Sequence, residues 1–189
     1  MNAKAMHITS EQLGDLQVSI YWLHDSRQFD QLAITASVIY QKLGFNHSVA
    51  DKVGHIIAEC YKIADEAQMA NLKGDHSAEK AAYIMAANKL QQAEVLLGYT
   101  KSVAMHQVRW WAHFRHKEKV RATYHLFVQN LQRWSIGGLF EAGKLTYALV
   151  RVGLAHNRRD RVGATRYLTT YWDILLQSPR KKTDLSYLG

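Results

Sequence analysis

Apolar residues recur every three or four positions along most of this 189-residue chain, which is the spacing of one face of an α-helix. Before position 100 the pattern falls into four segments. Their apolar positions are Leu13, Leu16, Ile20 and Leu23; Phe29, Leu32, Ala36, Ile39 and Leu43; Val49, Val53, Ile56, Cys60, Ile63 and Ala67; and Ala81, Met85, Leu90, Ala93 and Leu97. The first half of the chain is therefore predicted to form four helices.

Helix caps and stops fall between these segments. The candidate N-terminal caps are Thr9 or Ser10, Asp25 or Ser26, Asn46 or Ser48, and Ser77, and the candidate C-terminal stops are Gly44, Gly74 and Gly98. The short step 73–77 predicts a tight connection between two long helices. With its alanine-rich packing, the hairpin 48–97 resembles a tetratricopeptide-type pair, but it has no second copy in register, so we do not predict a repeat protein.

The second half continues in helices, predicted over 102–115, 118–134, 144–156 and 161–177. The helix 118–134 has the most regular apolar stripe, which predicts that the stripe is buried and that the opposite face is exposed. The stripe consists of Val120, Tyr124, Phe127, Leu131 and Trp134, and the opposite face carries Arg121, His125, Gln129 and Gln132. Three glycines within 135–143 predict a flexible connection.

These elements predict an all-α fold: a single helical bundle of about seven or eight helices over residues 1–189, with a short basic C-terminal tail at 179–189 that begins with Pro179. A single cysteine, Cys60, excludes an internal disulfide and a cysteine-based zinc site. No signal peptide is recognisable, and no apolar run approaches the ~18 residues of a membrane span. We therefore expect a cytoplasmic protein that does not contact a membrane.

Charge is divided unequally between the two halves. Residues 1–100 contain 8 Lys and Arg against 11 Asp and Glu, whereas residues 101–189 contain 16 against 5. Such asymmetry points to a polyanionic partner, DNA or RNA, that contacts the basic half 101–178 and its tail. The neutral-to-acidic half 1–100 is then free for a protein partner or for self-association.

Two groups of basic residues are the candidate contacts. In the first, cations are interleaved with aromatic residues, so phosphates can be neutralised while rings stack on unpaired bases. Its candidates are Arg109, Arg115, Lys117, Lys119, Arg121 and His125. The second group lies where one helix ends and the last begins, with Asp160 as the predicted cap, and free N–H groups there favour an anion. Its candidates are Arg158, Arg159, Arg161 and Arg166. The alternative is that these cations form a solvated surface.

Arg151 and His156 form an Arg-x4-His pattern that resembles the signature of the HEPN family of helical ribonucleases. The resemblance implies that Arg151 holds the scissile phosphate and that His156 assists proton transfer. His156 also follows the apolar stripe of Leu145, Leu149 and Val152, so a structural role is the alternative. The stretch 145–172 is similar in pattern to the terminal helices of small subunits of CRISPR effector complexes, which bind nucleic-acid backbone without catalysis.

Other chemistry has little support. His106, His113 and His116 lie within about 80° of one another on a helix, but no carboxylate other than Glu118 is near enough to complete a metal site. No phosphate-binding glycine loop, His-Glu-x-x-His or Cys-x-x-Cys pair is present. We expect no metal and no cofactor.

The sequence thus favours a non-catalytic nucleic-acid-binding helical protein, or a subunit of a larger nucleoprotein assembly, that contacts the phosphate backbone through its C-terminal half. One alternative is a metal-independent HEPN-like endoribonuclease that uses Arg151 and His156. The other is a helical adaptor for an acidic protein.

Overall fold

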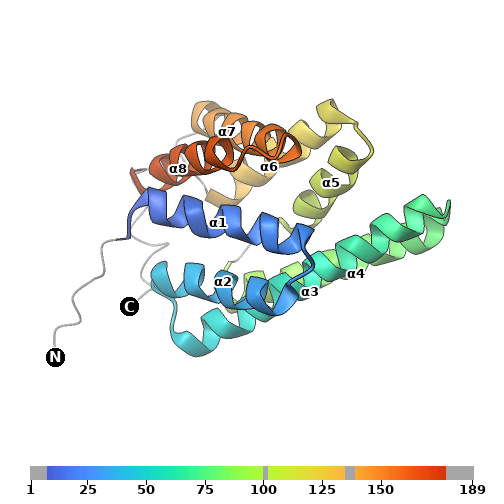
Figure 1. Cartoon of the computed structure of the whole chain (residues 1–189), viewed down its shortest axis with the longest axis horizontal. Helices are drawn as coiled ribbons and strands as arrows, with labels where there is room; N and C mark the ends of the chain where they lie inside the picture. Colours follow the sequence, from blue (N-terminus) through green and yellow to red (C-terminus); the bar gives the residue numbers. More distant parts are fainter. Residues whose placement is uncertain (1–7, 100–101, 135–138, 178–189) are drawn as a thin grey trace.

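The computed structural model describes residues 8–99, 102–134 and 139–177, without the side chains of residues 133 and 134. Within these ranges the fold is all-α, as predicted, and consists of eight helices (Figure 1). They are α1 (Ser10–Asp25), α2 (Phe29–Lys42), α3 (His47–Leu72), α4 (His76–Leu96), α5 (Ala104–Arg115), α6 (Lys119–Trp134), α7 (Leu139–Asn157) and α8 (Arg161–Gln177). None of the described helices is long and apolar enough to cross a bilayer.

The helices form a closed bundle in which neighbours in the chain are neighbours in space. Each helix packs against the next one along the chain, and α8 packs back against α1. In Figure 1, α7 and α8 lie on one side of α1 and α2 lies on the other, while the far end of the α3–α4 pair extends beyond the other helices. The basic second half and the first half therefore meet in two places, between α1 and α8 and between α4 and α5.

The main core holds α7 and α8 in place. It is built mainly from α1, α2, α7 and α8 around fully buried leucines such as Leu13, Leu32, Leu145 and Leu168, and α3 and α6 add Ala58 and Leu126. A smaller core lies between α3, α4 and α5, around Cys60. Because Cys60 is buried there, desolvation raises the pKa of its thiol to about 12.

Three of the predicted caps are confirmed. Thr9 forms a capping box with Gln12 at the start of α1. Asn46 caps α3 by accepting the N–H of Val49 at 2.9 Å. The Asp160 carboxylate accepts the N–H of Gly163 at 2.8 Å and so caps α8.

Two other predicted caps are wrong. Asp25 ends α1 and Ser26 is its C-terminal cap, so α2 begins after Gln28, whose side chain makes no capping bond. Ser77 lies inside α4, because Asp75 accepts the N–H of Ala78 at 2.9 Å and caps the helix earlier. In both connections another polar residue occupies the N-cap position: Gln28 before α2 and Asp75 before α4.

The predicted orientation of α6 is also wrong. Val120 and Tyr124, predicted to be buried, are 86% and 60% exposed. The buried face carries Ala122, Leu126, Gln129 and Asn130 instead. Gln129 donates to the side chain of Gln107 and Asn130 donates to the Thr146 hydroxyl at 3.2 Å, while the side-chain oxygens of Gln129 and Asn130 are buried without a hydrogen-bond partner. The side chain of Trp134 lies outside the described set.

The connection before α7 is shorter than predicted. The helix begins at Leu139 rather than at about residue 144, so Gly143 is helical. Residues 135–138 and the predicted basic tail 179–189 lie outside the described ranges.

Candidate nucleic-acid interface

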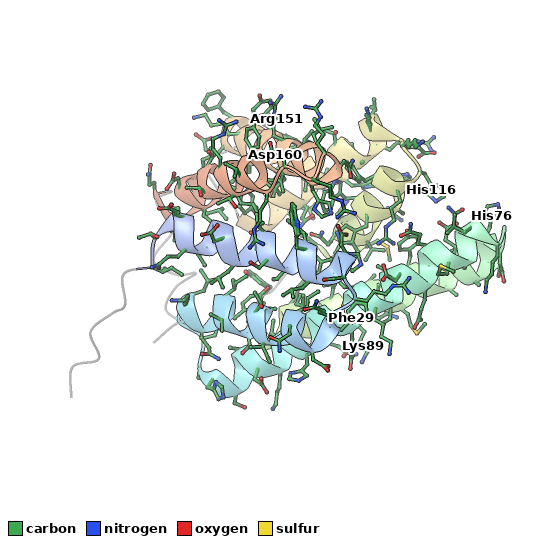
Figure 2. The ribbon with its side chains drawn as sticks, viewed as in Figure 1. Phe29, His76, Lys89, His116, Arg151 and Asp160 are labelled. Atoms are coloured by element: carbon green, nitrogen blue, oxygen red, sulfur yellow. The ribbon has the colours of Figure 1, made fainter. Side chains whose placement is uncertain are left out.

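The outer face of α7 and α8 presents a group of arginines to solvent. The apolar side of α7, with Leu145, Leu149 and Val152, is buried in the main core. Helical geometry then turns Arg151 away from the core. In Figure 2, Arg151 and Asp160 lie on the opposite side of α1 from α2 and Lys89.

Three of these arginines line one cavity of about 150 Å³, together with Tyr167 and Asp160. Arg151 donates to the Tyr167 hydroxyl at 2.7 Å, Arg166 donates to the same oxygen at 3.5 Å, and Arg158 is exposed at the end of α7. The hydrogen bond from Arg151, followed by that from Arg166, lowers the pKa of Tyr167. Among the described residues, no carboxylate lies within ion-pair distance of Arg151, Arg158 or Arg166. Their charge is therefore available to an external anion.

A second, larger cavity lies on the α1 side of the α7–α8 turn. Its volume is about 430 Å³, and Trp22, Asp25, Arg159 and Arg161 are among the residues that line it. Here the charges are partly satisfied, because Arg159 forms an ion pair with Asp25 and Arg161 donates to the Ser19 hydroxyl at 3.1 Å. Arg159 occupies the α7–α8 turn with a left-handed backbone, at a φ of 59°.

The first basic group is divided between surface and interior. Arg109, Lys117, Lys119 and Arg121 are exposed, and Lys117 occupies the α5–α6 turn with a φ of 62°. Arg121 shares Glu118 with His113, at 3.3 Å and 2.6 Å.

Arg115, the other arginine of that group, is largely engaged within the protein. It donates to the carbonyl of Ala64 and lies 3.7 Å from the Asp65 carboxylate, both on α3. Its side chain is 22% exposed. These contacts hold α5 against α3 and leave little of the guanidinium for a ligand.

His125 belongs to a histidine cluster that joins α5 and α6. Its Nδ1 lies 3.2 Å from Nδ1 of His106, and its ring stacks on that of His113 with centroids 5.3 Å apart. Desolvation, and then the neighbouring cations, lower the pKa of His106 and of His125. His116, the third histidine of the helical pattern with His106 and His113, lies outside this cluster and contacts Glu79 of α4 at 2.7 Å. No group of three potential ligands in the described part of the chain has the geometry of a metal site.

Arg151 and His156 contact different helices. Arg151 donates to Tyr167 of α8, whereas Nε2 of His156 lies 3.3 Å from the Asp25 carboxylate of α1. The His156 ring packs edge-on against Trp22, with centroids 4.8 Å apart. Its Nδ1 is buried without a hydrogen-bond partner. These surroundings match the structural alternative for His156.

Several residues of the outer face were not predicted from the sequence. Tyr167 organises two arginines, and Phe140, Lys144 and Tyr147 continue the exposed face of α7 beyond Arg151. Phe140, Lys144 and Tyr147 are spaced from Arg151 as residues on one face of a helix are, and this spacing is visible in the sequence although a count of charges does not detect it.

Comparison of the chain with known protein families, with curated proteins and with solved structures finds no match.

Proposed function

We propose that this protein binds nucleic acid without catalysis, through phosphate contacts from the outer face of α7 and α8. The observation that carries the proposal is the cavity lined by Arg151, Arg158 and Arg166, with no carboxylate at ion-pair distance among the described residues. Three arginines line this cavity against the single carboxylate of Asp160, so they repel one another and a bound anion relieves that repulsion.

Phosphate chemistry fits this cavity well. A guanidinium presents several N–H donors in a fork that matches the oxygens of a phosphate, and the Tyr167 hydroxyl already holds two of the three arginines in position. The whole chain carries a net charge of +8, so the field around it also favours a polyanion over a small neutral ligand.

The same contacts favour binding over cleavage. A ribonuclease of the HEPN type needs Arg151 and His156 at one phosphate, whereas these side chains contact Tyr167 and Asp25, respectively. DNA and RNA share the phosphate backbone, so the proposal covers both.

The test compares two variants with equal loss of charge. In the first, Arg151, Arg158 and Arg166 are replaced by Gln. In the control, the exposed lysines Lys52, Lys62 and Lys80 of α3 and α4 are replaced by Gln. Fluorescence anisotropy with a labelled oligonucleotide at about 50 mM salt gives the affinity of each.

We expect the arginine variant to bind at least ~10-fold more weakly, because one charge-assisted hydrogen bond is worth about 1.5–3 kcal/mol. The lysine control should change affinity less than about twofold, since its residues lie away from the cavity. Equal losses in the two variants, or no affinity of the parent for any probe, would contradict the proposal. Binding to an acidic protein in the latter case would favour the adaptor alternative.

A further inference from the structure

Aromatic and basic side chains alternate along the exposed face of α7. Phe140, Lys144, Tyr147 and Arg151 are spaced by four, three and four residues, and Arg158 follows seven residues later. This spacing keeps the first four within about 60° of one another around the helix axis, and Arg158 lies in the turn directly after α7. Phe140 is 69% exposed and Tyr147 is 63% exposed, so both rings are open to solvent.

Each exposed ring of this stripe has a cation over one of its faces. The Lys144 ammonium lies 4.2 Å from the Phe140 ring centre, and the Arg151 guanidinium lies 6.0 Å from that of Tyr147. On α8, the guanidinium of Arg166 is 5.2 Å from the ring of Tyr167. A flat apolar surface next to a positive charge is the complement of a nucleotide, in which a flat base is joined to a phosphate.

The stripe differs from the face of a helix that lies on a membrane. Such a helix leaves its apolar side free to enter the lipid, with the cations on the polar side. In α7 the apolar side, with Leu145 and Leu149, is already buried in the protein core. Cations occupy the middle of the exposed stripe, so a hydrated polyanion such as nucleic acid fits it better than the apolar interior of a bilayer does.

We infer that this stripe is a track for single-stranded nucleic acid, on which unpaired bases stack on Tyr147 and Phe140 while Lys144, Arg151 and Arg158 contact phosphates. The track rests on the nucleic-acid binding proposed above and adds a preference for unpaired bases, since bases inside a duplex stack on one another and leave no face for a side chain. From Phe140 to Arg158 the track is about 27 Å long. That length matches about eight nucleotides at the ~3.4 Å spacing of a stacked strand.

The experiment compares a labelled single strand of about 12 nucleotides with a duplex of the same sequence, a length that covers the whole track. The variants are Tyr147→Leu, the conservative Tyr147→Phe, and the control Tyr124→Leu. Tyr124 is a matched control because it is 60% exposed, on α6 and outside the stripe. Circular dichroism melts check that each variant is folded.

Tyr147→Leu should weaken single-strand binding roughly 5- to 150-fold, which corresponds to the ~1–3 kcal/mol of one stacked base. Tyr147→Phe should retain most of the affinity, and Tyr124→Leu should bind like the parent. Duplex binding should be weaker in the parent and insensitive to Tyr147→Leu.

Three results would overturn the inference. Equal affinity for single strand and duplex, with neither changed by Tyr147→Leu, would remove the track but leave the proposed function intact. No affinity for either probe would remove both. Tyr147-dependent binding to vesicles that contain phosphatidylglycerol, without oligonucleotide binding, would remove both and assign the stripe to a membrane surface.

Discussion

Replacing Leu126 by Ala tests which face of α6 is buried. Leu126 is 1% exposed and belongs to the main core, whereas Val120, on the stripe that the hydrophobic pattern favours, is 86% exposed. Truncating a fully buried leucine costs about 2–5 kcal/mol through lost burial and the cavity left behind. For a chain of this size, each kcal/mol lowers Tm by about 2–4 °C, so a loss of ~3 kcal/mol lowers it by about 6–12 °C.

Urea and thermal melts of Leu126→Ala and of Val120→Ala measure this difference. Val120→Ala should stay within about 0.5 kcal/mol of the parent because the side chain is solvated. A third variant, Gln129→Ala, should cost about 1–3 kcal/mol, since Gln129 is 5% exposed and its loss leaves the side-chain oxygen of the half-buried Gln107 without this donor. If Val120→Ala is as destabilising as Leu126→Ala and Gln129→Ala is neutral, α6 faces the opposite way.

Two further predictions follow from groups with shifted pKa values. Cys60 is fully buried and its pKa is raised to about 12. An aromatic disulfide reagent at neutral pH should therefore label the thiol only as fast as the protein opens. Rapid labelling of the native protein would contradict the burial of Cys60 in the smaller core. The pKa of His125 is lowered by burial and by His106, His113 and Arg109, so the folded protein binds a proton at His125 less readily than the unfolded chain does. The folded state therefore keeps its full stability above the ordinary histidine pKa of ~6.5 and loses stability as the pH falls below that value. His125→Gln should therefore lose less stability than the parent between about pH 8 and pH 5.5, measured by urea melts; equal losses would refute the role of the cluster.

Local signals in the sequence were enough for most of the fold. Thr9, Asn46 and Asp160 cap the helices that their positions predict, because a cap depends only on residues three apart in the chain. The α6 face was predicted wrongly because periodicity ranks faces by hydrophobicity alone. Gln129 and Asn130 are buried against partners on α5 and α7, which the periodicity of α6 cannot reveal.

The candidate site was only partly predictable for the same reason. The charge count identified Arg158 and Arg166, which line the cavity on the outer face. It could not identify Tyr167, which accepts hydrogen bonds from Arg151 and Arg166, nor the contact of Arg115 with Ala64, 51 residues away in the chain. These contacts arise from helices that meet only after the bundle closes.

The salt dependence of oligonucleotide binding tests the central claim most directly. The outer face offers four cations, Lys144, Arg151, Arg158 and Arg166. Each phosphate contact on a single strand contributes about −0.7 to the slope of log K against log salt, so the parent should have a slope of about −3. Replacing the three arginines by Gln should make the slope shallower by about 2 units. A parent slope near zero, or the same slope in both proteins, would contradict phosphate binding at α7 and α8.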